Sequence, residues 1–148
     1  MKKQFFALIA SITLAAGASA QVSVSQPWVR ATVPQQTSTG AFMQLSSTTD
    51  ARLVAVSTPA AGSAEIHKMA MEGQTMRMGQ VDGIDLPAGK TVSLAAGGYH
   101  IMLLDLKRQL KDGEAITLTL VLEDKHKKRQ NTTLTVPVKP IAYTGPQH

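Results

Sequence analysis

Histidine and methionine are concentrated in one short segment of the chain, EIHKMAMEGQTMRMG, which runs from Glu65 to Gly79. Within the twelve residues from His67 to Met78 there are four methionines, at positions 69, 71, 76 and 78. Methionine often fills irregular gaps in a core, but its thioether is also a ligand for soft metals. The segment is therefore either an unusually Met-rich core strand or a soft-metal site.

A two-residue loop at Gly73-Gln74 would place these side chains on one face of a β-hairpin. Glycine at the first central position suits a type II′ turn. The expected cross-strand pairs are Glu72 with Thr75, Met71 with Met76, Met69 with Met78, and His67 with Gln80. Because side chains alternate between the two faces of a strand, the imidazole and the thioethers share a face. His67 and Met78 then become diagonal neighbours, within reach of long side chains.

A second alternating pair occurs in GGYHIMLLDL, where His100 and Met102 fall on one face of a strand. Gly97 and Gly98, just before them, allow a tight bend or a close backbone approach. If this strand lies beside the hairpin, the cluster becomes His67, Met78, His100 and Met102.

The chemistry of such a cluster favours copper(I). Thioether sulfur selects cuprous copper, and imidazole accepts copper in either oxidation state. Calcium and magnesium require oxygen ligands, and zinc prefers thiolate or carboxylate to thioether. The alternative is core packing, since a methionine stripe with a histidine beside it is commonly interior. The repeated His-x-Met favours the metal, because packing gives no reason for the repetition.

The elements that must position these residues are short strands. Breakers such as Pro34, Pro59 to Gly62, Asp112 and Gly113 separate alternating or β-branched runs, and only Leu103–Leu110 suggests a short helical turn. This spacing predicts a single all-β sandwich or barrel domain. The expected strands are Val22–Thr32, Gly40–Ser47, Arg52–Ser57, Ala64–Met71, Thr75–Val81, Thr91–Leu94, His100–Leu106, Ile116–Glu123 and Asn131–Val138.

Residues 1–20 have the pattern of a secretory signal peptide. Lys2 and Lys3 precede an apolar run, and Ala18-Ser19-Ala20 is a small-residue cleavage signal. A buried N-terminal helix is the alternative. We therefore expect an exported, periplasmic protein whose domain spans 21–148, with no stable membrane insertion, because no other apolar run approaches the roughly 20 residues of a membrane span.

Composition excludes several classes of protein. The chain has no cysteine, so disulfides, thiolate metal sites and cysteine nucleophiles are absent. The net charge of +5 falls to +3 when Lys2 and Lys3 are removed (13 basic minus 10 acidic residues). The basic cluster from Lys125 to Arg129 is interpreted as a solvated hairpin turn rather than a nucleic-acid-binding patch, because few aromatic residues accompany it.

The spacing of His67, ten residues, Met78, twenty-one residues and His100-x-Met102 resembles the signature of the PCuAC copper chaperone family. The resemblance extends over roughly residues 24–138. Four further blocks look like family blocks, in family order: Trp28-Val29-Arg30-Ala31, Thr39-Gly40-Ala41-Phe42-Met43, Leu86-Pro87-Ala88-Gly89 and Gly97-Gly98-Tyr99-His100-Ile101-Met102.

This resemblance implies a cupredoxin-like Greek-key β-sandwich that binds one copper(I) through His67, Met78, His100 and Met102. It implies delivery to the binuclear copper centre of cytochrome c oxidase, or exchange with a thioredoxin-like Sco-type chaperone, by a protein that we expect to be a monomer. Met69, Met71 and Met76 would be auxiliary, either as a docking surface for copper in transfer or as a shield against water. The C-terminal tail offers only His148, so we expect no strong second copper site.

Other functions predict different features. A blue-copper electron carrier needs a cysteine, which is absent. A hydrolytic or redox enzyme, which we do not expect, would need acidic residues such as Glu65 or Asp105 beside the histidines. A copper buffering or resistance protein would use the same site without a dedicated recipient. A purely structural sandwich predicts that His67 and His100 lie far apart.

Overall fold

The computed structural model describes residues 22–146, and the expected signal peptide at 1–20 and His148 lie outside this range. Within it, no helix is long and apolar enough to cross a membrane. The described residues form ten strands: β1 (Val22–Arg30), β2 (Ser38–Ser47), β3 (Ala51–Ser57), β4 (Ala61–Glu72), β5 (Thr75–Gln80), β6 (Ile84–Leu86), β7 (Thr91–Leu94), β8 (Tyr99–Leu106), β9 (Ala115–Asp124) and β10 (Arg129–Lys139).

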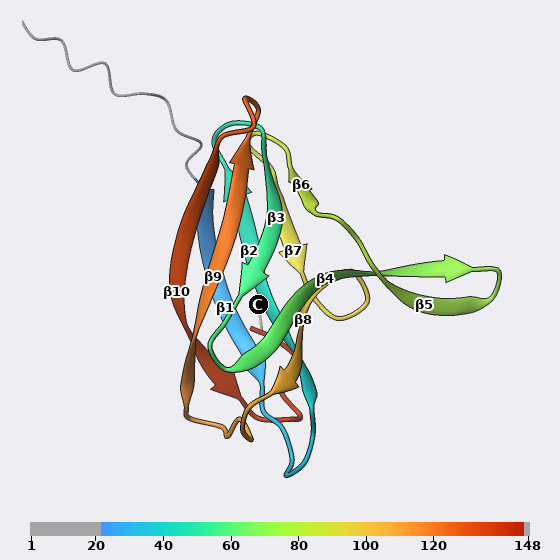
Figure 1. Cartoon of the computed structure of the whole chain (residues 1–148). Helices are drawn as coiled ribbons and strands as arrows, with labels where there is room; N and C mark the ends of the chain where they lie inside the picture. The colour runs from blue at the N-terminus through green and yellow to red at the C-terminus, as the bar shows by residue number, and fades with distance from the viewer. Residues whose placement is uncertain (1–21, 147–148) are drawn as a thin grey trace, which may run out of the picture.

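The strands form two packed layers (Figure 1). Their order is β5-β4-β8-β7-β2-β1-β10-β9-β3-β6, with β8 also paired to β2. A short parallel pairing, Val29 with Val138 and Arg30 with Lys139, joins the layers where β1 meets β10. The strand that shows the packing most clearly is β9, in which buried Ile116, Leu118, Leu120 and Leu122 alternate with more exposed residues. One face of each layer therefore supplies the core.

The all-β prediction is confirmed, and each of the nine expected strands exists with ends displaced by at most three residues. Two details were wrong. The three-residue strand β6 was missed because Gly83 and Pro87 bracket it so closely. The helical turn at Leu103–Leu110 does not form, because β8 continues to Leu106, which pairs with Ala61 of β4.

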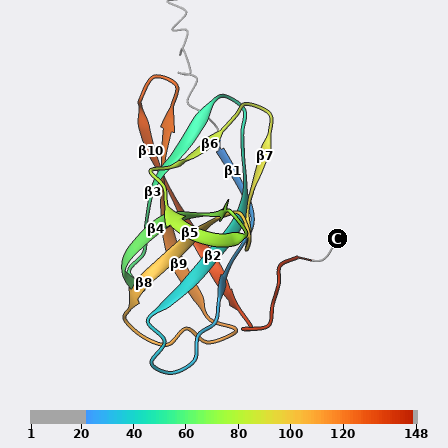
Figure 2. The ribbon, with the colours of Figure 1, turned by 90° about the vertical axis from the view of Figure 1, so that its right-hand side faces the viewer.

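The β4–β5 hairpin projects from the body (Figures 1 and 2). The first part of β4 pairs with β8 as far as Lys68 opposite Tyr99, and the rest of β4 pairs only with β5. We call residues 68–80 the arm. Its register is the predicted one, with Glu72 opposite Thr75, and Gly73 has a φ of 63°, as a type II′ turn requires. The two faces of the arm are therefore fixed by its turn.

Candidate metal centre

His67 and His100 are direct cross-strand partners on β4 and β8. Their ring centroids lie 5.8 Å apart, with the ring planes inclined by 49°. The two His-x-Met segments are therefore adjacent in space, which contradicts the structural-sandwich reading with its separated histidines. The pairing joins residues 33 positions apart in the chain, so the fold, rather than local structure, assembles the site.

His100 is held between two groups that can accept a hydrogen bond. Its Nε2 atom lies 3.0 Å from the Met78 sulfur, and its Nδ1 atom lies 3.4 Å from the Gly98 carbonyl oxygen. A neutral imidazole has one N–H, so only one of these contacts contains a proton. The ring nitrogen of His100 that lacks the proton has a lone pair, and a metal cation could bind to it.

Burial lowers the pKa of His100 below its usual value of 6.5. The residue is 6% exposed, so water stabilises its charged form poorly. The Gly98 carbonyl acts in the opposite direction, and the neighbouring His67 lowers the pKa further. The lowered pKa favours the neutral imidazole, the state in which histidine binds a metal.

His67 is oriented by Glu65, two residues earlier on the same face of β4. The distance from His67 Nε2 to Glu65 Oε2 is 2.7 Å, and the two side chains are 12% and 30% exposed. In contrast, His67 Nδ1 is buried and has no hydrogen-bond partner among residues 22–146. Such an orphaned nitrogen is unusual in a folded protein and marks a position where a ligand would fit.

The methionine members of the predicted set lie at different depths. Met78 is 49% exposed and belongs to β5, diagonally across from His67. Met102 is half-buried in β8, where its register partners are Glu65 of β4 and Gly40 of β2. The structure thus brings His67, His100 and Met78 together and places Met102 on the same face of the sheet.

An aromatic wall closes the site on the side of β2. The rings of Phe42 and His100 lie 6.3 Å apart, and Trp28 stacks on the far side of Phe42 at 4.5 Å. Gly40 makes this arrangement possible, because a β-carbon there would lie 2.7 Å from the Phe42 Cζ atom. Both aromatic side chains are 6% exposed, so this side of His100 is shielded from water.

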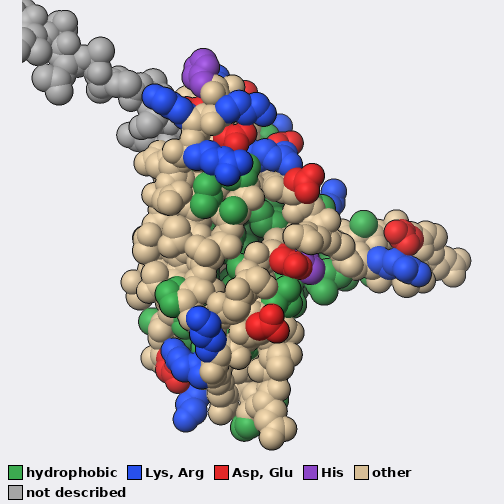
Figure 3. All heavy atoms as spheres, viewed as in Figure 1, with side chains coloured by type: hydrophobic (Ala, Val, Ile, Leu, Met, Phe, Trp, Pro, Cys, Tyr) green, Lys and Arg blue, Asp and Glu red, His purple; other side chains and the backbone are tan. Residues whose placement is uncertain are grey.

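The remaining methionines of the segment lie on the arm. Met71 opposes Met76, and Met69 opposes Met78, all on the face that His67 occupies nearer the body. Met71 is 60% exposed and Met76 is 47% exposed, so neither is a core residue. Figure 3 shows the arm extending into solvent, with purple histidine and red acidic side chains adjacent where it leaves the body.

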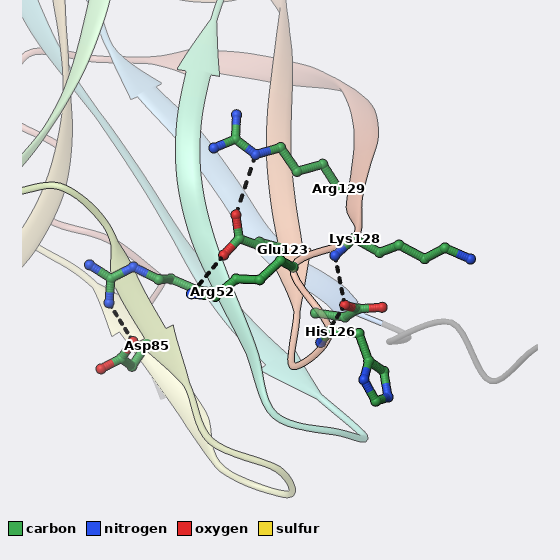
Figure 4. Close-up of polar contacts among 8 residues, drawn as sticks. Arg52, Asp85, Glu123, His126, Lys128 and Arg129 are labelled. Atoms are coloured by element: carbon green, nitrogen blue, oxygen red, sulfur yellow. Dashed lines mark hydrogen bonds and ion pairs between the residues drawn. The ribbon is translucent and has the colours of Figure 1, made fainter.

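The basic cluster forms a turn at the far end of β9 and β10. The Asp124 carboxylate accepts hydrogen bonds from the backbone N–H groups of His126 and Lys128, at 2.8 and 2.9 Å. Figure 4 shows this turn, with Glu123 reaching toward Arg129. The expectation of a solvated hairpin turn is confirmed, and the turn is remote from His67 and His100, which lie on β4 and β8.

Of the two acidic residues Glu65 and Asp105, only Glu65 lies beside a histidine of the centre. Asp105 does not join the histidines, because it lies against Gly62, whose added β-carbon would be 2.9 Å from the Asp105 Cβ. Glu65 does contact His67, whereas the sequence pattern suggests an acidic residue beside the histidines only for an enzyme. The i, i+2 spacing of Glu65 and His67 on one strand was the signal for their contact.

The donor set is chemically soft. It consists of imidazole nitrogens and thioether sulfurs, which suit cuprous copper and serve hard cations poorly. Among residues 22–146, no group of three His, Cys, Asp or Glu side chains is arranged to hold a metal ion. Any metal at this position would therefore draw on methionine.

Similar proteins share this fold and include copper-bound examples. The copper-bound PCuAC domain from PmoF2 matches with a TM-score of 0.65 and 26% identity, covering 80% of this chain and 92% of that domain. The copper(I) form of DR1885 from Deinococcus radiodurans matches with a TM-score of 0.54 and 32% identity, covering 84% and 83%. Among curated relatives, "Putative lipoprotein Lxx21020" of Leifsonia xyli subsp. xyli is 33% identical over 119 residues, covering 80% of this chain and 69% of the relative.

The fold is thus a cupredoxin-like β-sandwich of the kind found in PCuAC domains. The model of the family described as "Putative lipoprotein LpqE-like" matches residues 22–138. The chain belongs to this LpqE-like family, which is the PCuAC family, and the predicted family resemblance is confirmed.

Proposed function

We propose that this protein is a copper(I) chaperone that carries one ion in the centre between β4, β5 and β8. The observation that carries the proposal is the contact between His100 Nε2 and Met78 Sδ at 3.0 Å, directly beside His67. This contact joins an imidazole and a thioether, the two ligand types that cuprous copper accepts. Copper-bound relatives with the same fold support the same cargo.

The proposed ligands are His67, Met78, His100 and Met102. The set carries no negative charge, so it matches a monovalent ion of low hardness better than a divalent one. Each ligand comes from a strand rather than a loop, and β8 supplies two of them from one face. Because strands are rigid elements, such a set would hold the ion without a large rearrangement.

The auxiliary methionines Met69, Met71 and Met76 have a proposed role in transfer. Met71 and Met76 are exposed on the arm, on the same face as Met78. A recipient that approaches the arm meets thioethers first, and neutral sulfur ligands exchange copper(I) stepwise with incoming Met, His or Cys groups. This exposure favours delivery over simple buffering, because a storage site gains nothing from accessible sulfur.

The recipient is proposed from the family: the binuclear copper centre of cytochrome c oxidase, reached directly or through a Sco-type chaperone.

We further propose that the protein works in the periplasm as a monomeric carrier, not an enzyme. The lipoprotein names of the family and of the Leifsonia xyli relative support export. The absence of cysteine suits an oxidising compartment, since thioethers form no disulfides.

An anaerobic copper(I) titration against a chromophoric chelator tests the proposal. The native domain is compared with a His100→Ala, Met102→Ala double variant and with His126→Ala, which removes a histidine from the remote turn. We expect one tight equivalent in the native protein and in His126→Ala, and a sharply weakened one in the double variant. Failure of the native protein to compete, or equal binding by the double variant, would reject the four-ligand site.

A further inference from the structure

We infer that Glu65 is a positioning residue that fixes which nitrogen of His67 is offered to the cargo. This inference rests on the proposed copper(I) centre and deepens it. The distance of 2.7 Å between Glu65 Oε2 and His67 Nε2 is that of a charge-assisted hydrogen bond. An ionised carboxylate only accepts hydrogen bonds, so Nε2 carries the ring proton.

The other nitrogen follows from this assignment. A histidine binds a metal as the neutral imidazole, which has one N–H, so with the proton on Nε2 the lone pair lies on Nδ1 of His67. This atom is buried and has no hydrogen-bond partner in the part of the chain that the structure describes. Burying an acceptor without a partner costs free energy, and a metal ion that binds to it removes the cost. The nitrogen that the protein leaves open is therefore Nδ1, and copper(I) binds His67 through this atom.

The location of Glu65 is consistent with a supporting role rather than a coordinating one. It shares the face of β4 with His67 and lies opposite Met102 in register on β8. Its carboxylate is a hard oxygen donor, which suits copper(I) less well than the imidazoles and thioethers nearby. Its side chain is 30% exposed, whereas that of His67 is 12% exposed, so Glu65 borders the centre on its solvent side.

The two histidines are thus held in a comparable way. His100 has a backbone carbonyl, that of Gly98, at its Nδ1, and His67 has a carboxylate at its Nε2. A histidine that ligates a metal commonly donates its second N–H to such a group, which fixes the ring and raises the basicity of the ligating nitrogen. These contacts use Nε2 of His67 and Nδ1 of His100. The lone pairs that remain for the metal are therefore on Nδ1 of His67 and Nε2 of His100.

The tautomer can be read directly in the metal-free protein. A long-range ¹H–¹⁵N correlation spectrum of the imidazoles distinguishes a protonated Nε2 from a protonated Nδ1. For the native protein we expect the His67 resonances of the Nε2–H form, and a shift of the Nδ1 resonance on addition of copper(I). A protonated Nδ1 in the metal-free protein, or copper-induced shifts at Nε2 of His67, would overturn the inference.

Variants separate positioning from general stability. Glu65→Ala removes the acceptor, and we expect the Nε2–H population and the copper(I) affinity to fall together, the affinity by about 10–100-fold. Glu65→Gln keeps the shape but can donate as well as accept, so both quantities should be intermediate. Glu72→Ala is the matched control, because it removes an acid from the opposite face of β4, where Glu72 pairs with Arg77; it should match the native protein.

The outcomes also separate this inference from the proposed function. If the native protein does not bind copper(I) tightly, the proposed function fails, while the tautomer of His67 is still measured in the metal-free protein. If the native protein binds tightly and Glu65→Ala binds equally tightly, the positioning role alone is wrong. Tighter binding by Glu65→Ala would show that the carboxylate obstructs the centre.

Discussion

His67 and His100 face each other across adjacent strands, with ring centroids 5.8 Å apart. Among residues 22–146, Nδ1 of His67 has no hydrogen-bond partner, and Nε2 of His100 lies 3.0 Å from the Met78 sulfur. Because both imidazoles would ligate one ion, their contributions to binding cannot be independent. This coupling is the basis of the first prediction.

The first prediction concerns the two histidines as a unit. His67→Ala and His100→Ala should each reduce the copper(I) affinity by at least the roughly 10–100-fold typical of supporting groups around a metal. The double variant should lose less than the product of the two single losses, since either change already disrupts the centre. Chelator competition on the four proteins measures this. Additive losses would indicate that the histidines bind separately.

A second prediction concerns Gly40. Gly40→Ala places a β-carbon 2.7 Å from the present position of the Phe42 ring, so the ring must move. We expect a loss of about 1–3 kcal/mol of folding free energy through overpacking, and weaker copper(I) binding, because Phe42 shields His100. Urea unfolding and chelator competition give the two quantities.

Gly79→Ala is the control for this change, because a β-carbon at Gly79 meets no atom within 4 Å. It should leave both quantities close to native. If Gly40→Ala also behaves like the native protein, the aromatic wall does not depend on the close approach at Gly40.

The third prediction is a pH dependence of the metal-free protein. Burial lowers the pKa of His100 below 6.5, so between the folded and unfolded pKa values the unfolded state binds more protons. The contribution of His100 to the free energy of unfolding is fully present above about pH 6.5, and it is lost as the pH falls through the pKa of His100 in the folded state. We expect the free energy of unfolding to decline on acidification in this range.

Replacing His100 by Gln should flatten that decline, whereas His126→Gln should retain the part that His100 causes, because it leaves His100 and its burial unchanged. Urea titrations between pH 5 and pH 8 provide the comparison. An equally steep decline in His100→Gln would assign the pH dependence to other groups.

A fourth prediction addresses the arm. A Met71→Leu, Met76→Leu variant keeps apolar bulk but removes two exposed thioethers. We expect a nearly native equilibrium affinity, because neither residue is a proposed ligand, but slower transfer of copper(I) to a thiol- or methionine-containing acceptor. Stopped-flow measurement of transfer tests this, with Arg77→Gln on the opposite face as control. Native transfer rates would leave the methionines with a shielding role.

Local features of the arm were predictable from sequence, whereas its surroundings were not. Gly73 fixes the turn, and the turn fixes the register of Met69 with Met78. The pairing of His67 with His100 was inferred only conditionally, because strands so distant in sequence give no local sign of their neighbours. The Glu65 contact depends on a side-chain conformation, and the strand period indicates only the face on which Glu65 lies.

The carbonyl oxygen of Gly98 has two neighbours. It accepts the backbone N–H of Met69 on the arm at 3.1 Å and lies 3.4 Å from His100 Nδ1. One oxygen atom therefore connects the position of the arm to the orientation of a buried imidazole. A recipient that moves the arm away from the body would also displace the carbonyl oxygen that orients His100. Docking of the recipient would then itself weaken the hold of the protein on copper(I).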